Sequence, residues 1–394
     1  MSILRQISSV TAMNVRSLPQ RLGTSSVVVI GMAGVVGVLV CVLAVSAGFR
    51  DTMLSTGHPD RAIVMRSGST NETGSSIGIA AAQTIMGAPG VARTADGKPA
   101  ASAEMFLSVN LLRKEDGARA GIIVRGVGPE GLAIRPELKL TEGRMFQPGL
   151  RELIAGRAAQ MEFQGLDLGD EVMLRDGPWT VVGTFAAGDN ANESTLMTDS
   201  DTLLSAYQRT VYNSVRVKLA SPEAYGEFRD ALTTDPTLSV NVMTEPEYYA
   251  QAAQNFGPLF LVITVVVGGI MAVGALFAAL NTMYSAVSTR AVEIATLRAI
   301  GFGAGGVVSS VLAEALLLAL IGAVIGASAA MLFFNGNTIS LGGNVGSIVA
   351  EMRITPALIG AGIAWACVIG LLGGLFPAIR AARLPVATAL RAVA

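Results

Sequence analysis

Residues 25–47 read SSVVVIGMAGVVGVLVCVLAVSA and contain no charged side chain. They belong to a longer uncharged stretch of 28 residues between Arg21 and Arg50. A helix needs roughly 20 apolar residues to cross the ~30 Å hydrocarbon core of a bilayer, so this stretch predicts a transmembrane helix. Val45-Ser46-Ala47 has the small residues of a signal-peptidase site, but the apolar run before it is about twice the length of a signal-peptide core, which favours an uncleaved span.

Three further stretches have the same character. Between Glu247 and Arg290 lie 42 uncharged residues, and between Arg353 and Arg380 lie 26. Residues 305–334 are apolar except for Glu314. Each stretch is long enough to span a bilayer. The sequence therefore predicts four transmembrane helices.

The charged residues are concentrated in one region of the chain. Only 14% of the 394 residues are charged and 51% are hydrophobic, whereas soluble proteins carry about 25% charged residues. Residues 49–255 nevertheless hold 19 Lys and Arg and 26 Asp and Glu, which is an ordinary density for a soluble domain. The fold class expected is an α-helical membrane protein with four transmembrane helices and an inserted α+β extracytoplasmic domain.

The arginines of the short segments predict the orientation of the chain. They are enriched before the first span, between the second and third spans, and after the fourth. Both termini are therefore expected in the cytoplasm, with the large domain periplasmic. The expected segments are a cytoplasmic amphipathic helix 1–21, transmembrane helix 22–48, core domain 49–255, transmembrane helix 256–285, cytoplasmic coupling segment 286–304, transmembrane helix 305–334, extracytoplasmic loop 335–353, transmembrane helix 354–379 and cytoplasmic tail 380–394.

The inserted domain shows mixed strand and helix patterns. Seven segments have the composition of strands, and they cover residues 62–66, 104–112, 120–127, 171–174, 180–185, 214–219 and 238–243. Helical patterns cover residues 79–86 and 222–233, and Asp176-Gly177 is typical of a hairpin turn. We expect two subdomains, one discontinuous over 50–100 and 207–250 and one inserted over 101–206. Residues 67–78 are expected to form a polar flexible loop.

Several chemistries are disfavoured by the residues present. No phosphate-binding loop occurs, because Gly97-Lys98 is followed by Pro99 and has no glycine five positions before it. Gly301, Gly303 and Gly306 match a dinucleotide fingerprint by spacing only, without a preceding strand. A single histidine and two cysteines disfavour a zinc site or a disulfide scaffold. With a net charge of −1, nucleic acid is not an expected partner.

Two features of the predicted spans are informative. Glu314 lies about nine residues into the third span, where an ionisable group is costly and is a candidate functional residue. With no second acid or histidine in the spans, a proton pathway is disfavoured, and snorkelling or a hydrogen bond to a neighbouring helix is an alternative. Small residues at short spacings let helices approach closely, and the candidate packing positions are Gly31, Gly34, Gly322, Gly326, Gly370 and Gly374.

Between the second and third spans, residues 288–303 read STRAVEIATLRAIGFG. A short helix of mixed charged and apolar residues between two spans is either a juxtamembrane anchor or a contact for a soluble partner. The segments Asn281-Thr282-Met283, Arg290 to Gly301, Glu314-Ala315 and Gly374 to Ala382 resemble, in order and spacing, the C-terminal half of the FtsX-like permeases of the MacB-type (type VII) ABC transporter superfamily. Residues 140–146 and 179–185 resemble the periplasmic core domain of that family less specifically.

The resemblance implies an assembly and a role for several residues. The inserted domain would have a porter-like and a β-rich subdomain, and two permease copies or paralogues would form a dimer. An ABC ATPase subunit, separate because this chain starts with its amphipathic helix, would hold ATP and Mg²⁺, so this chain would be no enzyme and would bind no metal or cofactor. Glu314 and Asn281 are intramembrane coupling candidates, and the ATPase-coupling residues implied are Arg290, Glu293, Ile294, Thr296, Leu297, Arg298, Ala299, Ile300 and Gly301.

The function implied is that of a permease subunit in a bacterial inner membrane. ATP hydrolysis by the partner would drive periplasmic movements (mechanotransmission) for export or efflux, with a membrane-fusion protein, an outer-membrane channel and membrane lipid as further partners. The alternatives are a lipoprotein-releasing subunit, a non-transporting regulator that activates a cell-wall hydrolase, and a sensor that signals to a kinase. The sequence carries no readable signature of the substrate.

Overall fold

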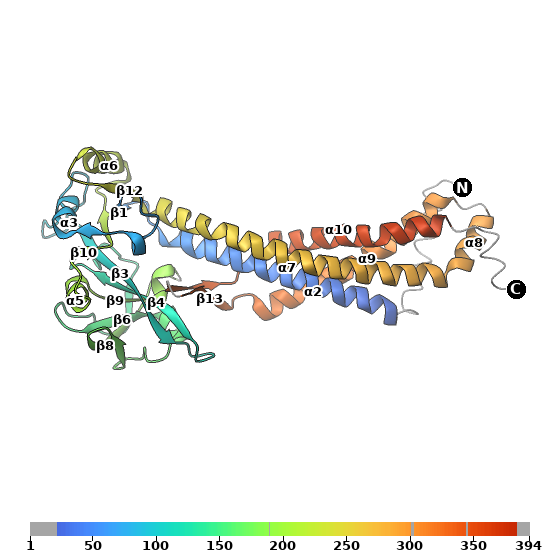
Figure 1. The fold of residues 1–394 in the computed structure, drawn as a ribbon, viewed down its shortest axis with the longest axis horizontal. Helices are drawn as coiled ribbons and strands as arrows, with labels where there is room; N and C mark the ends of the chain where they lie inside the picture. Colours follow the sequence, from blue (N-terminus) through green and yellow to red (C-terminus); the bar gives the residue numbers. More distant parts are fainter. Residues whose placement is uncertain (1–21, 189, 301–302, 344–345, 384–394) are drawn as a thin grey trace. The chain divides into compact units, whose positions relative to one another are not determined.

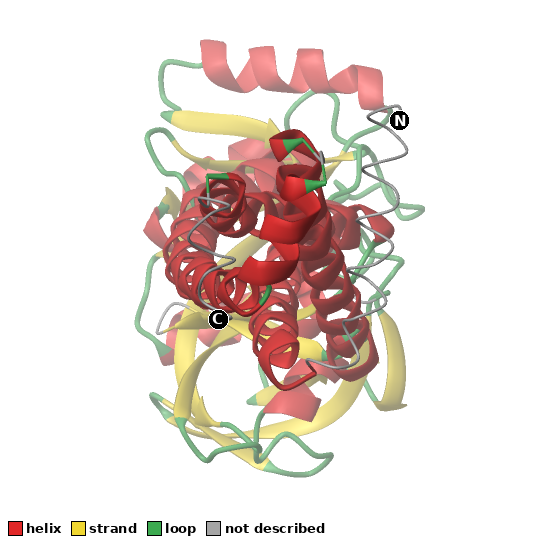
Figure 2. Cartoon of the chain, turned by 90° about the vertical axis from the view of Figure 1, so that its right-hand side faces the viewer, coloured by secondary structure: helices red, strands yellow, loops and turns green. Residues whose placement is uncertain are grey.

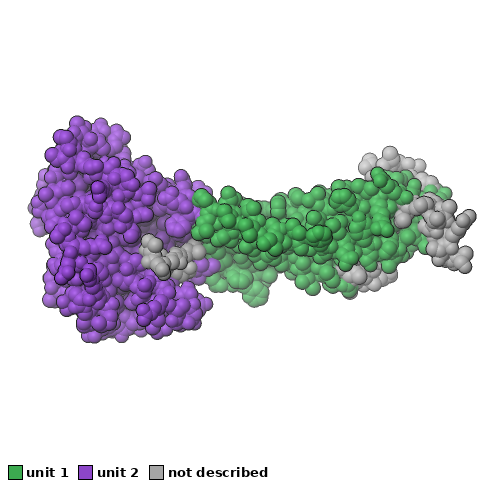
Figure 3. Space-filling model, viewed as in Figure 1, with its two compact units in different colours: residues 1–47, 258–337, 352–394 green, residues 48–257, 338–351 purple. Residues whose placement is uncertain are grey.

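The computed structural model describes residues 22–188, 190–300, 303–343 and 346–383. The expected amphipathic helix 1–21, Gly301 and all but the first residues of the expected 380–394 tail lie outside these ranges. The chain divides into two compact units (Figure 3). Unit 1 comprises residues 1–47, 258–337 and 352–394, and unit 2 comprises residues 48–257 and 338–351.

Four long helices supply the membrane part of the protein (Figure 1). They are α2 (Leu22–Thr56), α7 (Glu245–Thr289), α9 (Ala304–Phe334) and α10 (Pro356–Ala382). Each is long and apolar enough to cross a membrane, by length and composition. This confirms the predicted fold class of four transmembrane helices with an inserted α/β domain. A short helix, α8 (Ala291–Ala299), lies between α7 and α9, and α2 and α7 both continue into unit 2.

Small residues bring the helices of unit 1 together. A Cβ atom built on Gly322 would lie 2.7 Å from the Cβ of Met32 on α2, and one built on Gly326 would overlap the carbonyl oxygen of Ala33. Gly370 and Gly374 of α10 face α9 with similarly little space. Glycine at these positions lets the helix backbones approach, which gains van der Waals contact in the absence of a hydrophobic driving force.

Unit 2 is built on one ten-stranded sheet within the described residues (Figure 2). Its order is β12-β1-β11-β3-β4-β9-β6-β8-β5, with β7 paired to β8. The strands are β1 (Arg61–Arg66), β3 (Ala101–Leu112), β4 (Arg119–Val127), β5 (Lys139–Gly143), β6 (Glu152–Gly156), β7 (Glu171–Leu174), β8 (Gly177–Ala186), β9 (Thr195–Asp199), β11 (Ser214–Lys218) and β12 (Val240–Thr244). β2 (Ile77–Gly78) and β10 (Val211–Tyr212) form a small separate pair.

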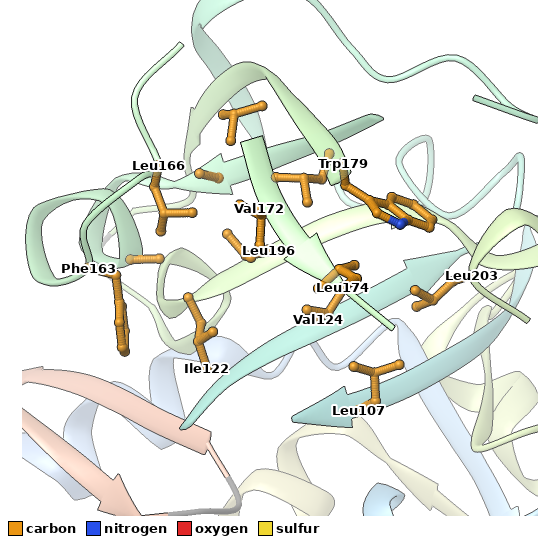
Figure 4. Packing of buried hydrophobic residues seen from close by; sticks show 14 of the residues in the cluster. Leu107, Ile122, Val124, Phe163, Leu166, Val172, Leu174, Trp179, Leu196 and Leu203 are labelled. Atoms are coloured by element: carbon orange, nitrogen blue, oxygen red, sulfur yellow. The ribbon is translucent and has the colours of Figure 1, made fainter. Parts of the chain in front are cut away.

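The sheet supports several hydrophobic clusters, two of which lie toward its opposite ends. At one end, α3 (Ile79–Met86) and α6 (Tyr225–Thr234) pack with β1, β11 and β12. β11, α6 and β12 form the predicted β-α-β unit, with β1 inserted antiparallel between its two strands. At the other end, the core includes Trp179 (Figure 4). The indole N–H of Trp179 donates to Asp176 Oδ1 at 2.9 Å. Two short helices, α4 (Arg157–Glu162) and α5 (Ser200–Ala206), complete this part.

The segment between α9 and α10, expected to be a loop, contains a β-hairpin. Its strands are β13 (Thr338–Gly343) and β14 (Gly346–Glu351), paired antiparallel. The hairpin belongs to unit 2, where β14 packs against β4 and the 3-10 helix η3 (Ala191–Ser194). The backbone N–H of Val349 donates to Ser194 Oγ at 2.9 Å, and Ala350 is buried.

Candidate coupling site

Helix α8 presents one face to solvent and buries the other. Ile294 is 8% exposed and packs in a cluster with residues of α7, α9 and α10. Glu293, Thr296 and Ile300 are exposed, and Ile300 is 69% accessible. Positions three and four residues apart lie on the same side of a helix, so these three side chains share one face. The helix is therefore fixed to unit 1 by its apolar side and displays a mixed polar and apolar side.

The remaining predicted coupling residues differ in exposure. Ala299 is exposed and Arg298 is half-buried. Leu297 lies in α8, and Gly301 lies outside the described residues. Asn281 is exposed on α7. In unit 1, the glycines Gly31 and Gly34 of α2 have open space where a Cβ would stand, in contrast to the crowded glycines of α9 and α10.

Arg290, which precedes α8, is turned into the helix bundle. Its Nη1 donates to Glu314 Oε2 on α9 at 3.1 Å, and both residues are 5% exposed. The charge of Glu314 is therefore compensated by an arginine located at the junction between α7 and α8. A buried ion pair of this kind is sensitive to loss of one partner, because the other charge is then left uncompensated. The pair connects the intramembrane acid to the segment that carries α8.

Unit 2 contains a second, larger set of buried charges, which we call the ion cluster. It consists of Arg61, Glu72, Glu104, Arg125, Arg135, Glu137, Arg216 and Glu245. Every member is buried except Glu137, whose side chain is 15% exposed. Four guanidinium groups therefore face four carboxylates, and the cluster is electrically balanced.

The alternation of side chains along the strands creates the cluster. In β11, Val215 and Val217 point into the hydrophobic core, so Ser214 and Arg216 point to the opposite face. Glu104 of β3 lies opposite Ser214 in the register, which places it on the same face. This polar face is covered by the 3-10 helix η2 (Glu72–Gly74), by the connection between β4 and β5, and by the first turn of α7.

Glu245, the first residue of α7, joins the helix to the cluster. Its Oε1 accepts from Arg216 Nη1 at 2.6 Å, and its Oε2 lies 3.8 Å from Arg61 Nη1. Arg61 also makes a bidentate pair with Glu137, with both distances 2.7 Å. An acidic residue is favourable at a helix N-terminus, where the backbone N–H groups concentrate positive charge. The helix that enters the membrane is thus attached by its first residue to the sheet of unit 2.

The arginines keep the buried carboxylates ionised. Burial raises the pKa of Glu72, but the charges of Arg125 and Arg216 outweigh it and hold that pKa well below the ordinary value. Burial likewise opposes ionisation of Glu104, and Arg135, Arg125 and Arg216 lower its pKa. Burial alone would lower the pKa of Arg216, but Tyr249, Glu72, Glu245 and Glu104 surround the guanidinium group and raise its pKa well above the ordinary value. Glu72, Glu104 and Arg216 are therefore charged at neutral pH.

Sequence patterns did not identify the cluster. Residues 67–78 were expected to be a flexible polar loop, but Glu72 within them is only 2% exposed and accepts from both terminal nitrogens of Arg125. The alternation in β3 and β11 was visible, yet a polar strand face normally meets water. The signal available was Glu104 in β3 together with Arg216 in β11, because glutamate is depleted in strands.

Family models match both parts of the chain. Residues 23–235 match the MacB-like periplasmic core domain, and residues 265–386 match the FtsX-like permease C-terminal domain. No curated protein matches the sequence.

Among solved structures, the chain is similar to the extracellular domain of the noncanonic ABC-type transporter YknZ from Gram-positive bacteria, with 17% identity over 47% of this chain and 100% of that chain and a TM-score of 0.36. It is also similar to the periplasmic region of MacB from Actinobacillus actinomycetemcomitans, with 15% identity over 50% and 93% of the two chains and a TM-score of 0.37. The core-domain model alone matches more than half of the chain, and the chain belongs to the FtsX-like permeases of the MacB-type ABC transporter superfamily.

Proposed function

We propose that this chain couples ATP hydrolysis by a separate ATPase subunit to movements of its inserted domain, and that these movements drive export or efflux. The observation that carries the proposal is helix α7. It is one helix of 45 residues that begins in the ion cluster at Glu245 and ends at Thr289, next to Arg290 and α8. At 1.5 Å per residue it is roughly 68 Å long. A displacement at one end of such a helix reaches the other.

The family supplies the setting for this proposal. The chain is an ABC transporter-type permease and a multi-pass inner-membrane protein, and permease-type families are normally the non-catalytic membrane components. Such a permease works with an ABC ATPase partner. We propose that ATP and Mg²⁺ bind in that partner and that this chain holds no cofactor. We place both termini and α8 in the cytoplasm and the inserted domain in the periplasm, from the arginine distribution.

We assign the ATPase contact to the exposed face of α8. Glu293, Thr296 and Ile300 offer a carboxylate, a hydroxyl and an apolar side chain on one side of the helix. Ile294 holds the other side in the bundle, so a force on α8 is transmitted to α9 and α10. The Arg290–Glu314 pair adds a polar attachment between the same elements.

A second permease copy is an expected partner. On α2, Val27 and Ile30 are 53% and 69% exposed, and Gly31 and Gly34 beside them have open space around their α-carbons. A face with small residues flanked by apolar ones suits a closely approaching helix. A membrane-fusion protein and an outer-membrane channel complete the export assembly that we propose.

The experiment replaces Glu293 and Arg298 together by alanine in the complex with the native ATPase. We expect ATP turnover to lose its dependence on the permease, while the complex still folds. The matched control replaces Glu227 and Arg229, the same residue types exposed on α6 of the inserted domain. Normal coupling in the first variant would show that α8 is not the ATPase contact. Robust ATP turnover by the purified chain alone would overturn the requirement for a partner ATPase.

A further inference from the structure

The 3-10 helix η3 is contacted at its two ends by segments that lie far apart in the chain. At its first residue, the backbone N–H of Ala191 donates at 3.0 Å to the Oγ1 of Thr56, the last residue of α2. At its last residue, the Oγ of Ser194 accepts at 2.9 Å from the backbone N–H of Val349 in β14. All four residues belong to unit 2. A helix of four residues therefore joins the end of α2 to the hairpin β13–β14.

The hydroxyl group of Thr56 is oriented for its contact with η3. It donates to the carbonyl oxygen of Thr52, one turn earlier in α2, at 2.7 Å, and its oxygen is then placed to accept from Ala191. The first N–H groups of a helix have no partner within that helix. Thr56 supplies an acceptor for the first of them, and Asn190 Oδ1 accepts from the next, that of Asn192, at 3.0 Å. Thr56 is 1% exposed, so this cap is shielded from water.

Ser194 binds an N–H group at the outer edge of the hairpin. Among the described strands, β13 and β14 pair only with each other, and a strand with one antiparallel partner has every second N–H group directed away from it. Val349 donates to Ser194 through such a group. Ser194 is 1% exposed and Ala350, beside Val349, is 3% exposed. The hairpin is therefore attached to η3 by a buried hydrogen bond as well as by packing.

η3 is firmly packed between these two contacts. Glu193 is 2% exposed, and its Oε1 accepts from the backbone N–H of Ala187. A Cβ atom built on Gly156 would lie 2.2 Å from the carbonyl oxygen of Glu193, so β6 meets η3 without a gap. At about 2.0 Å per residue, the two ends of η3 are only roughly 6 Å apart along its axis. A close-packed interior transmits strain, so a displacement at one end of η3 reaches the other.

The segments that connect the hairpin to α9 and α10 are bonded to each other. The backbone N–H of Ile354 donates to Asn335 Oδ1 at 2.9 Å, and that of Met352 donates to the carbonyl oxygen of Asn337 at 2.8 Å. The pairing of β13 with β14 thus continues beyond the hairpin, along the chain toward both helices. A movement of the end of either helix therefore acts on both strands of the hairpin together.

We propose that η3 is a junction that makes the last turn of α2 and the hairpin between α9 and α10 move together, with Thr56 and Ser194 as its positioning residues. Three of the four long helices are then linked through η3 to β9, the strand that follows it. The fourth, α7, is attached separately at the ion cluster. This junction goes beyond the proposed function, which assigns the transmission to α7, and it does not depend on an ATPase.

The test measures hydrogen exchange by mass spectrometry in the full chain in detergent, without an ATPase. Thr56→Val removes one acceptor hydroxyl while it preserves the shape of the side chain, and Ser194→Ala removes the other. Thr56→Ser keeps the hydroxyl group. The matched controls are Thr233→Val and Ser205→Ala, because each of these exposed hydroxyls donates to the carbonyl oxygen four residues earlier in its helix, as that of Thr56 does.

We expect Thr56→Val to accelerate exchange in residues 346–351 of the hairpin by about threefold or more, although the hydroxyl of Thr56 bonds to η3 and not to the hairpin. A lost buried hydrogen bond shifts a local opening equilibrium by a factor of this order. Ser194→Ala should accelerate exchange in residues 50–56 of α2 by a similar factor, because coupling between two sites is reciprocal. Thr56→Ser and both controls should leave these two segments unchanged.

Two results would overturn the proposal. Exchange that rises only beside the substituted residue would show that η3 does not connect α2 to the hairpin. Exchange that rises equally in α6, residues 225–234, would show that the variants loosen the whole domain. The two variants test the two directions separately, so a folding defect in one leaves the other decisive. Failure of the α8 variant to uncouple ATP turnover has no bearing on these outcomes, so the two proposals fail separately.

Discussion

Replacing Glu72 by glutamine tests whether the ion cluster holds the inserted domain together. Glu72 accepts from Arg125 at 2.9 and 3.0 Å and from Ser214 at 2.7 Å, and it lies 3.2 Å from Arg216. The substitution preserves the shape of the side chain but leaves four guanidinium groups facing three carboxylates. Removing one partner from a buried ionic group costs about 3–5 kcal/mol. That is a large share of the roughly 5–15 kcal/mol by which a domain is stable.

The assay is urea unfolding of the full chain in detergent, followed by tryptophan fluorescence. The chain has two tryptophans, and Trp179 is fully buried in unit 2, so a Trp365→Phe background makes the signal specific for the inserted domain. The control Asp230→Asn breaks an exposed pair with Arg229 and should leave the unfolding midpoint unchanged. Combining Glu72→Gln with Arg125→Met should recover part of the loss, because it restores the charge balance. A loss below about 1 kcal/mol in Glu72→Gln would refute the view that the cluster is a structural junction.

The remaining predictions concern pH, helix packing and the intramembrane pair. The pKa values of Glu72, Glu104 and Glu137 are depressed in the folded protein, so the stability these groups contribute is complete above the ordinary glutamate pKa of 4.5 and is lost as the pH falls below it. The midpoint of unfolding reported by Trp179 should therefore be level from about pH 7 to about pH 5 and then fall. Gly326→Ala should destabilise the bundle by about 1–3 kcal/mol because its methyl group meets α2, whereas Gly274→Ala, where the space is open, should be neutral in the same thermal melt. In a double-mutant cycle, the losses of stability in Arg290→Met and Glu314→Gln should add up to more than the loss in the variant that carries both substitutions. A sum equal to the loss in the double variant would show that the two residues do not interact.

The spans and most strands follow from local patterns in the sequence. Uncharged stretches locate the helices because a charge in hydrocarbon is costly at every position. Strands such as β7 and helix α3 were predicted with their observed ends, because turn residues flank them. The strands β6 and β9 were missed, since every residue in each is buried and neither shows alternation.

The parts of the site that depend on long-range contacts were not predictable. Arg290 and Glu314 are 24 residues apart and meet only because α8 turns the chain between them. The alternation of residues in β11 predicts the side of the sheet on which Arg216 lies. It does not predict that η2 and α7 cover that side. The hairpin β13–β14 lies in a glycine-rich segment with weak strand signals, and it is ordered by packing on β4 and η3. Residues whose local pattern predicts solvent exposure are therefore buried here because segments distant in the sequence pack over them.

We propose that α7 connects an ATPase contact at α8 to the ion cluster at Glu245, where the helix begins. Hydrogen exchange of residues 61–66 and 240–257, measured in the complex with the native ATPase, tests it most directly. We predict that a non-hydrolysable ATP analogue changes exchange in both segments, and that the Glu293→Ala, Arg298→Ala variant abolishes the change. Exchange that does not respond to the nucleotide, or a response that persists in this variant, would contradict the claim.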